Sequence, residues 1–264
     1  MNFTDSHCHI DFPAFDNERR TILEQCCQNN INKIIVPAVS PSKWQSLLDI
    51  TKNNTTNCQL YPCLGIHPWY LNNLHDNHLL QLEKMIFDNR QKIIAIGETG
   101  LDGVIALEQN NLAKQQAFFE FHIIMANQFN LPLIVHHRRT HPQIFQQLKS
   151  TKVNKRGVIH AFSGSYQQGK SYIDLGFKLG IGGTISYSRA EKTIKAVKRF
   201  PLESLVLETD ASAMPLQGMQ GKDNSPLMLS PIFEILVSLR SESKEEIAET
   251  IENNIEQIFK LKPL

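Results

Sequence analysis

Short runs of β-branched and other apolar residues recur along the whole chain, and amphipathic stretches with helical period lie between them. Runs of this length and composition are typical of buried strands. The predicted strands are residues 3–9, 33–36, 60–64, 93–96, 133–135, 158–159, 177–181 and 205–207. The predicted helices include residues 20–27, 44–48, 79–86, 115–127, 193–200 and 232–239. This alternation indicates an α/β fold, either a (β/α)8 barrel or an open doubly wound sheet.

Most of the predicted strands end in a side chain of a kind that binds metals, and the positions of these side chains help to distinguish the two folds. These side chains are His7, His9, Glu98, His136, His160 and Asp210. In a closed barrel the strand ends converge on one mouth, whereas in an open sheet they would be spread along a crevice. The sequence therefore predicts a TIM (β/α)8 barrel of the metallo-dependent hydrolase type.

The chain length of 264 residues fits one such barrel. No internal repeat and no Pro/Gly-rich linker marks a boundary, so we expect residues 1–264 to form a single barrel domain. Residues 213–226 are rich in Gly, Pro, Gln and Asn, and we predict that they form a long active-site loop after the eighth strand.

Charge and composition limit the class of protein. The chain has 27 lysines and arginines against 26 acids, and this balance argues against a protein that coats DNA. It is compatible with an enzyme that holds one or two phosphates, because bound metals can supply positive charge locally. The N-terminus resembles no export signal, no apolar run is long enough for a bilayer, and the five cysteines form no zinc motif. We therefore expect a soluble cytoplasmic protein with no membrane partner and no obligate protein partner.

The pair His7 and His9 is the sharpest local signal. Residues two apart on a strand point to the same face, so two imidazoles could hold one metal there. The alternative is two hydrogen-bonded histidines that face a loop. Glu98 ends the most apolar predicted strand, where a carboxylate is costly unless it is paired or binds a cation. Because a carboxylate has two oxygens, Glu98 is the candidate to bridge two metals, although an N-cap or ion-paired acid is the alternative.

His136 and His160 each follow a short apolar run, and together they could hold a second metal. Strand alternation predicts that His137 points away from His136 and has a structural role. Asp210 ends the last strand, which neighbours the first in a closed barrel. It is therefore the candidate to bind metal beside His7 and to accept a proton from the attacking water.

Glu208 is expected to face outward, on the helix side. Arg138 shares the inward face of His136 and could bind a phosphate or carboxylate, or it could be a solvated loop arginine. His67 ends the third strand and is predicted to contact substrate rather than metal, because the other candidates already complete two sites. Three further histidines are predicted to be structural, namely His75, His78 and His122.

With these residues in place, the chain resembles the TatD family of metal-dependent deoxyribonucleases, most closely its YjjV-like branch. The matching motifs run in order along the chain: residues 5–11 (DSHCHID), 65–68 (GIHP), 97–102 (GETGLD), 135–138 (VHHR), 159–164 (IHAFSG), 207–211 (LETDA) and 254–259. The resemblance implies a TIM barrel, two divalent metals and phosphodiester hydrolysis. It implies one metal held by His7, His9, Glu98 and Asp210, and a second held by Glu98, His136 and His160. The chain departs from the family pattern after Asp102 and after Asp210.

We therefore expect a hydrolase that uses two divalent cations (Mg, Mn or Zn), with Asp210 and Glu98 as catalytic groups and DNA or short nucleic-acid ends as substrate. One alternative is an amidohydrolase-type enzyme that cleaves a C–N or ester bond. The acid at position 98, where a carbamylated lysine would otherwise bridge the metals, argues against it. A barrel that only binds ligands is the other alternative, and the retention of every candidate ligand disfavours it.

Overall fold

The computed structural model describes residues 1–261 of the chain. Its strands form one parallel eight-stranded sheet in which they follow sequence order. They are β1 Phe3–Asp5, β2 Ile31–Pro37, β3 Gln59–Leu64, β4 Ala95–Asp102, β5 Leu133–Arg138, β6 Gly157–Ile159, β7 Lys178–Ile181 and β8 Leu205–Leu207. Each predicted strand overlaps an observed one.

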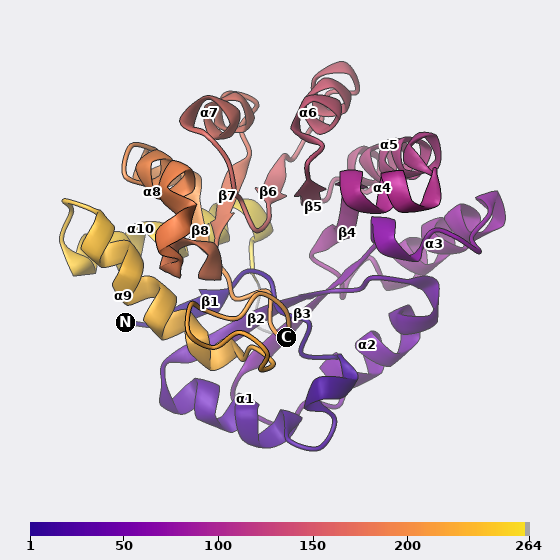
Figure 1. The fold of residues 1–264 in the computed structure, drawn as a ribbon. Coiled ribbons are helices and arrows are strands. Elements are labelled where there is room, and N and C mark those ends of the chain that lie inside the picture. The colour runs from indigo at the N-terminus through magenta and orange to yellow at the C-terminus, as the bar shows by residue number, and fades with distance from the viewer. Residues whose placement is uncertain (262–264) are drawn as a thin grey trace.

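The helices lie outside the strands and fan out around them (Figure 1). They are α1 Arg19–Gln28, α2 Trp44–Lys52, α3 Asp76–Asn89, α4 Gly103–Gln109, α5 Leu112–Phe129, α6 His141–Ser150, α7 Tyr166–Asp174, α8 Glu191–Val197, α9 Leu229–Leu239 and α10 Lys244–Phe259. Strands buried under helices have to be apolar on both faces, which explains their short uninterrupted β-branched runs. The predicted TIM barrel is confirmed.

Hydrogen bonds just past the strand ends connect the last strand to the first. Ser6 N donates to Leu207 O at 3.0 Å, and Asp210 N donates to His7 O at 2.9 Å. The buried Asp5 carboxylate accepts the backbone N–H and the hydroxyl of Thr209 at 3.0 and 2.5 Å. The segments that carry His7 and Asp210 are therefore held side by side.

Two strand boundaries differ from the prediction. β1 ends at Asp5, because the residues that follow it donate alternately to both neighbours, with Cys8 N bonded to Ile35 O and His9 N bonded to Ala211 O. β4 continues to Asp102, because residues 99–102 pair with β5. Gly100 allows this close approach, since a Cβ at its φ of +137° would lie 2.1 Å from the His136 carbonyl oxygen. Glu98 thus lies within β4 and not at its end.

The segment after β8 is a long loop, as predicted, and it leads to a short 3-10 turn and then to α9. Asn224 fastens its far end by donating from Nδ2 to Thr209 O at 2.9 Å. Met214 from this loop contributes to the wall of the barrel mouth. None of the helices within residues 1–261 has the length and apolar content needed to cross a bilayer.

Candidate metal centre

The carboxylate of Glu98 lies at the centre of the barrel mouth, and its two oxygens face different histidines. Oε2 lies 3.2 Å from His7 Nε2 and 3.3 Å from His9 Nε2. Oε1 lies 3.1 Å from His136 Nδ1 and 3.0 Å from His160 Nε2. Glu98 is almost fully buried. One acid thus joins the two histidine pairs that the sequence singled out.

Asp210 completes the first group, because its Oδ1 lies 3.6 Å from the Nε2 atoms of both His7 and His9. The two groups are close together, since the rings of His7 and His160 stack with their centroids 3.9 Å apart. Three overlapping sets of possible ligand atoms have every member within 4.8 Å of the others: His7 with His160 and Asp210, His7 with His9 and Glu98, and His67 with Glu98 and His136. The structure therefore gathers all six predicted ligand-type side chains.

Three of these histidines have an oxygen opposite the second ring nitrogen. Nδ1 of His9 lies 3.1 Å from the carbonyl of Pro37, and Nε2 of His136 lies 3.1 Å from Asp102 Oδ2. Nδ1 of His160 lies 3.5 Å from Glu208 Oε1. At His9 and His136 the acceptor keeps the proton on that nitrogen and leaves the nitrogen at the centre with a free lone pair, the arrangement typical of metal-binding histidines. His160 Nδ1 is near Glu208 but beyond hydrogen-bonding geometry.

His67 also approaches Glu98 Oε1, at 3.2 Å, but its second nitrogen has the opposite role. Its Nδ1 accepts a hydrogen bond from Trp69 N at 3.1 Å. A neutral imidazole that accepts at Nδ1 carries its proton on Nε2, so the nitrogen that faces the centre is a donor. This geometry favours the predicted role of His67 in contacting substrate over a role as a ligand.

The electrostatics of the two acids differ. Burial alone would raise the pKa of Glu98, but the surrounding imidazoles outweigh it and hold that pKa well below its usual range. Burial raises the pKa of Asp210 to about 6, against the opposing effect of His160 and His9. Glu98 is therefore the permanent anion of the site, whereas Asp210 has an increased proton affinity.

Asp102 is a site residue that the sequence reasoning gave no role. Its Oδ2 accepts from Trp69 Nε1 at 2.7 Å and faces His136, while its Oδ1 caps α4 by accepting from Val104 N at 2.9 Å. Burial alone would raise the pKa of Asp102, but hydrogen bonds from His136 and Trp69 lower it below its usual range. The acid directly after the Gly97–Leu101 stretch on the same strand as Glu98 was the available signal.

The prediction that Glu208 faces outward is wrong. Its carboxylate is fully buried beside His160 and accepts the backbone N–H of Ala161 at 2.5 Å. Strand alternation does not apply to Glu208, because β8 ends at Leu207 and Glu208 lies beyond it. The neighbouring strand makes room for it with Gly180, where a Cβ would lie 2.0 Å from Glu208 Oε2.

The mouth above the centre is a cavity of about 460 Å³. Arg138 lies in its wall with a half-exposed side chain, and its guanidinium lies 3.8 Å from Asp102 Oδ2. Phe12, Trp69 and Tyr70 line the same cavity, and Trp69 is 47% exposed. Sequence patterns do not reveal this aromatic rim, because its members come from loops that only the fold brings together.

His75, His78 and His122 lie away from the centre. His75 and His78 form a capping box at the start of α3. His122 is buried on α5, where Nδ1 lies 2.6 Å from Phe118 O and Nε2 accepts from Ile66 N at 3.0 Å. His137 points to a neighbouring cavity, with its ring centroid 5.9 Å from that of Phe162.

Residues 4–260 match the protein family described as TatD related DNase. The chain belongs to the TatD-related DNase family. The predicted resemblance is thus confirmed over nearly the whole length, and the family agrees with the barrel and with the metal-binding side chains at its mouth.

Relatives of this TatD chain include metal-dependent hydrolases from Escherichia coli and Haemophilus influenzae. It is 39% identical over 257 residues to the uncharacterized metal-dependent hydrolase YjjV of Escherichia coli K12, which covers 97% of each protein. It is 40% identical over 263 residues to an uncharacterized metal-dependent hydrolase of Haemophilus influenzae, which covers 98% of this chain and 100% of the relative. The crystal structure of E. coli YjjV superposes with a TM-score of 0.93 and 38% identity over 98% of both chains. The TatD chain is accordingly a metal-dependent hydrolase.

Proposed function

We propose that this chain is a deoxyribonuclease or phosphodiesterase that uses two divalent cations. The observation that carries the proposal is the position of Glu98, whose two oxygens face two different histidine pairs. A carboxylate can bridge two cations through its two oxygens, whereas an imidazole offers one lone pair. A single cation would leave one histidine pair without a function.

The donor set fits such a pair of cations. Neutral imidazoles and ionised carboxylates suit Mn or Zn, and Mg is suited where carboxylates and waters dominate. One site would comprise His7, His9, Glu98 and Asp210, and the other Glu98, His136 and His160. Divalent cations bound there would neutralise charge on the phosphoryl oxygens and lower the pKa of a bound water.

The side chains around these sites support phosphoryl chemistry. Asp210 lies beside His7 and His9, and in this proposal it accepts the proton of the attacking water. His67 directs an N–H into the mouth, where it can donate to a phosphoryl oxygen. Arg138 adds a guanidinium from the wall of the same cavity.

The rim favours nucleic acid over a small neutral ester. Trp69 and Tyr70 are 47% and 43% exposed beside the cavity, and exposed aromatic rings of this kind stack on unpaired bases. The net charge of +1 argues against tight binding of long duplex through many phosphate contacts. Short or single-stranded DNA ends are therefore the proposed substrate.

A substrate panel tests this function. Metal-loaded protein is assayed on short single-stranded DNA, bis(p-nitrophenyl) phosphate, a neutral aryl ester and an amide, each with and without chelator. We expect hydrolysis of the two phosphodiesters and its loss with chelator. Hydrolysis confined to the ester or the amide would assign the centre to amidohydrolase chemistry instead.

A further inference from the structure

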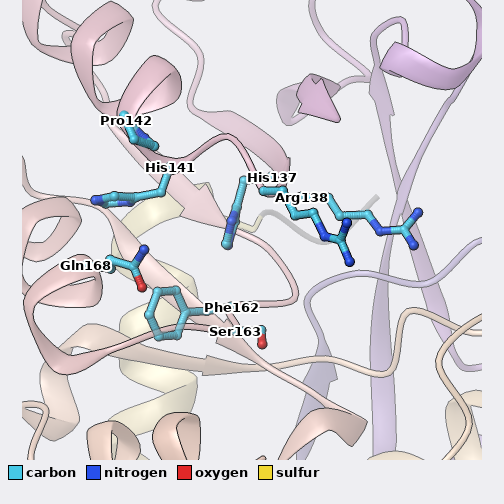
Figure 2. Close-up of a pocket in the computed structure, with 8 residues that line it drawn as sticks. His137, Arg138, His141, Pro142, Phe162, Ser163 and Gln168 are labelled. Atoms are coloured by element: carbon cyan, nitrogen blue, oxygen red, sulfur yellow. The ribbon is translucent and has the colours of Figure 1, made fainter. Parts of the chain in front are cut away.

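A second cavity, of about 400 Å³, lies beside the mouth of the barrel. Three residues, His137, Arg138 and Ser163, belong to the walls of both cavities. Figure 2 shows His137 in the middle of this side pocket, with His141 and Gln168 to one side and Arg138 to the other. The two cavities are therefore adjacent, and one substrate could place neighbouring groups in both.

Several polar atoms at the side pocket are buried and have no hydrogen-bond partner within the described residues. They include His137 Nε2 and His141 Nδ1 from the lining and, next to the pocket, the hydroxyl of Tyr172. The ring centroids of His141 and Tyr172 are 4.8 Å apart, so these atoms belong to one cluster. Gln168 uses Oε1 to accept from Ser165 N at 2.9 Å, which leaves its amide N–H groups available as donors. Buried polar groups in proteins are normally satisfied, so a polar ligand is indicated here.

The charged residues that line the side pocket indicate the charge of that ligand. Arg138 and Arg139 both line the side pocket, and none of the eight lining residues in the described chain is acidic. Arg138 has one distant acid, Asp102, at 3.8 Å. Arg139 forms no ion pair with any residue among 1–261 and is exposed. A phosphate site typically has this composition: one guanidinium without a counter-ion, a second with only a distant one, and imidazole and amide groups beside them.

We propose that the side pocket binds a second phosphate of the substrate, on the nucleotide next to the one at the metal centre. The inference rests on the proposed phosphodiesterase function, because it identifies the first phosphate with the group held by the metals. Arg139 holds the second phosphate from within the side pocket, and Arg138 lies between the two. The enzyme thereby binds a strand that carries a second phosphate more tightly than it binds an isolated phosphate ester.

Thymidine 3′,5′-bisphosphate is the probe that tests this directly, because it carries two phosphates and has no phosphodiester bond to cleave. Its affinity for the metal-loaded protein is compared, by isothermal titration calorimetry, with the affinities of thymidine 5′-monophosphate, thymidine 3′-monophosphate and inorganic phosphate. We expect the bisphosphate to bind about tenfold more tightly than the better monophosphate, the effect of one charge-assisted hydrogen bond.

The variant Arg139→Asn should abolish this gain while both monophosphates bind as before. Asn suits the site because Arg139 has a φ of +56°, a conformation that Asn adopts readily. Arg90→Asn is the control, because this substitution removes the same charge far from both cavities. Arg90 precedes β4 and lies at the opposite end of the barrel. Thermal melting of each variant checks that the barrel is intact. A bisphosphate that binds no tighter than a monophosphate, or a gain that survives Arg139→Asn, would overturn the proposal.

The outcome is independent of the reaction itself. Cleavage of the dinucleotide TpT by the parent protein is measured separately. If TpT is not cleaved but the gain from the second phosphate depends on Arg139, the side pocket is a phosphate site and the proposed reaction is wrong. If TpT is cleaved and the gain is absent, the proposed function stands and the second phosphate site does not exist.

Discussion

The rings of His67 and His136 lie with their centroids only 4.3 Å apart, yet their second nitrogens meet opposite partners. Asp102 accepts from His136, whereas Trp69 N donates to His67. Two histidines at the same carboxylate are thus prepared for different tasks, one to offer a lone pair and the other to offer a proton. Residue type and spacing cannot show this difference, because it depends on a neighbour of each ring.

This assignment predicts different effects for two matched substitutions. His136→Gln should lower the bound metal by one equivalent, because Nδ1 of the ring is lost. His67→Gln should retain the metal and lower kcat about 10²-fold, the typical cost of one transition-state donor. Elemental analysis and steady-state kinetics on the same samples measure both. Loss of a metal in the His67 variant would instead make His67 a ligand.

Asp210→Asn tests the proton acceptor. Asp210 has a φ of +53°, which Asn tolerates equally well, so the amide can keep the shape and one oxygen ligand without accepting a proton. We expect kcat to fall by about 10²–10⁴-fold, as for loss of a general base. Metal content is measured on the same preparation. A variant that holds its metals and turns over like the parent would remove Asp210 from this role.

At the scale of elements, α5 is joined to the segment after β3 by His122, which contributes to stability and not to the site. Burial lowers the pKa of His122 to about 4, and its hydrogen bond to Phe118 O only partly offsets this. The folded state therefore prefers the neutral ring. The unfolded chain takes up the proton near its ordinary pKa of about 6.5. Stability from this residue is complete above that pH and is lost as the pH falls toward 4.

The pH dependence of unfolding tests this element. Between pH 7 and pH 5 the parent should lose about 2 kcal/mol more unfolding free energy than His122→Gln, which cannot titrate. Urea unfolding at several pH values measures both proteins, and contributions from the other histidines cancel in the difference. Parallel curves for the two proteins would show that His122 is not held neutral by the fold.

The sequence predicted the existence of the strands better than the residues at which they end. Short continuous apolar runs, separated by amphipathic stretches, located all eight strands, because buried parallel strands need continuous apolar sequence. It identified no helix at residues 141–150 or 166–174, because α6 and α7 are rich in glutamine and have only narrow apolar faces. β4 was predicted too short, because pairing with β5 and not local composition extends it past Glu98.

In the whole molecule, the part of the site that lies on strands and at their ends could be predicted from the sequence. His7, His9, Glu98, His136, His160 and Asp210 meet because strand ends converge in a barrel. The position of Glu208, the aromatic rim and the side pocket were not predicted. Glu208 lies past the end of β8, where strand alternation no longer applies. The rim and the side pocket are formed by segments that only the fold brings together, so local sequence does not reveal them.

The charge of the whole molecule predicts how binding responds to salt. With a net charge of +1, only the phosphates at the mouth and in the side pocket should be held. For two phosphates on a single strand, log K against log salt should have a slope of about −1.4. Fluorescence anisotropy with a short thymidine oligonucleotide and metal-loaded Asp210→Asn measures it. A slope of about −4 or steeper would indicate an extended binding surface.

Glu98 is proposed to join two divalent cations that phosphodiester hydrolysis requires. The most direct measurement counts the metal per chain in protein purified without chelator, and assays cleavage of TpT in that sample, after chelation and after adding metal back. We predict two equivalents per chain, loss of cleavage when they are removed, and recovery when they are restored. Full cleavage by a verified metal-free preparation, or full cleavage with a single equivalent bound, would contradict the account.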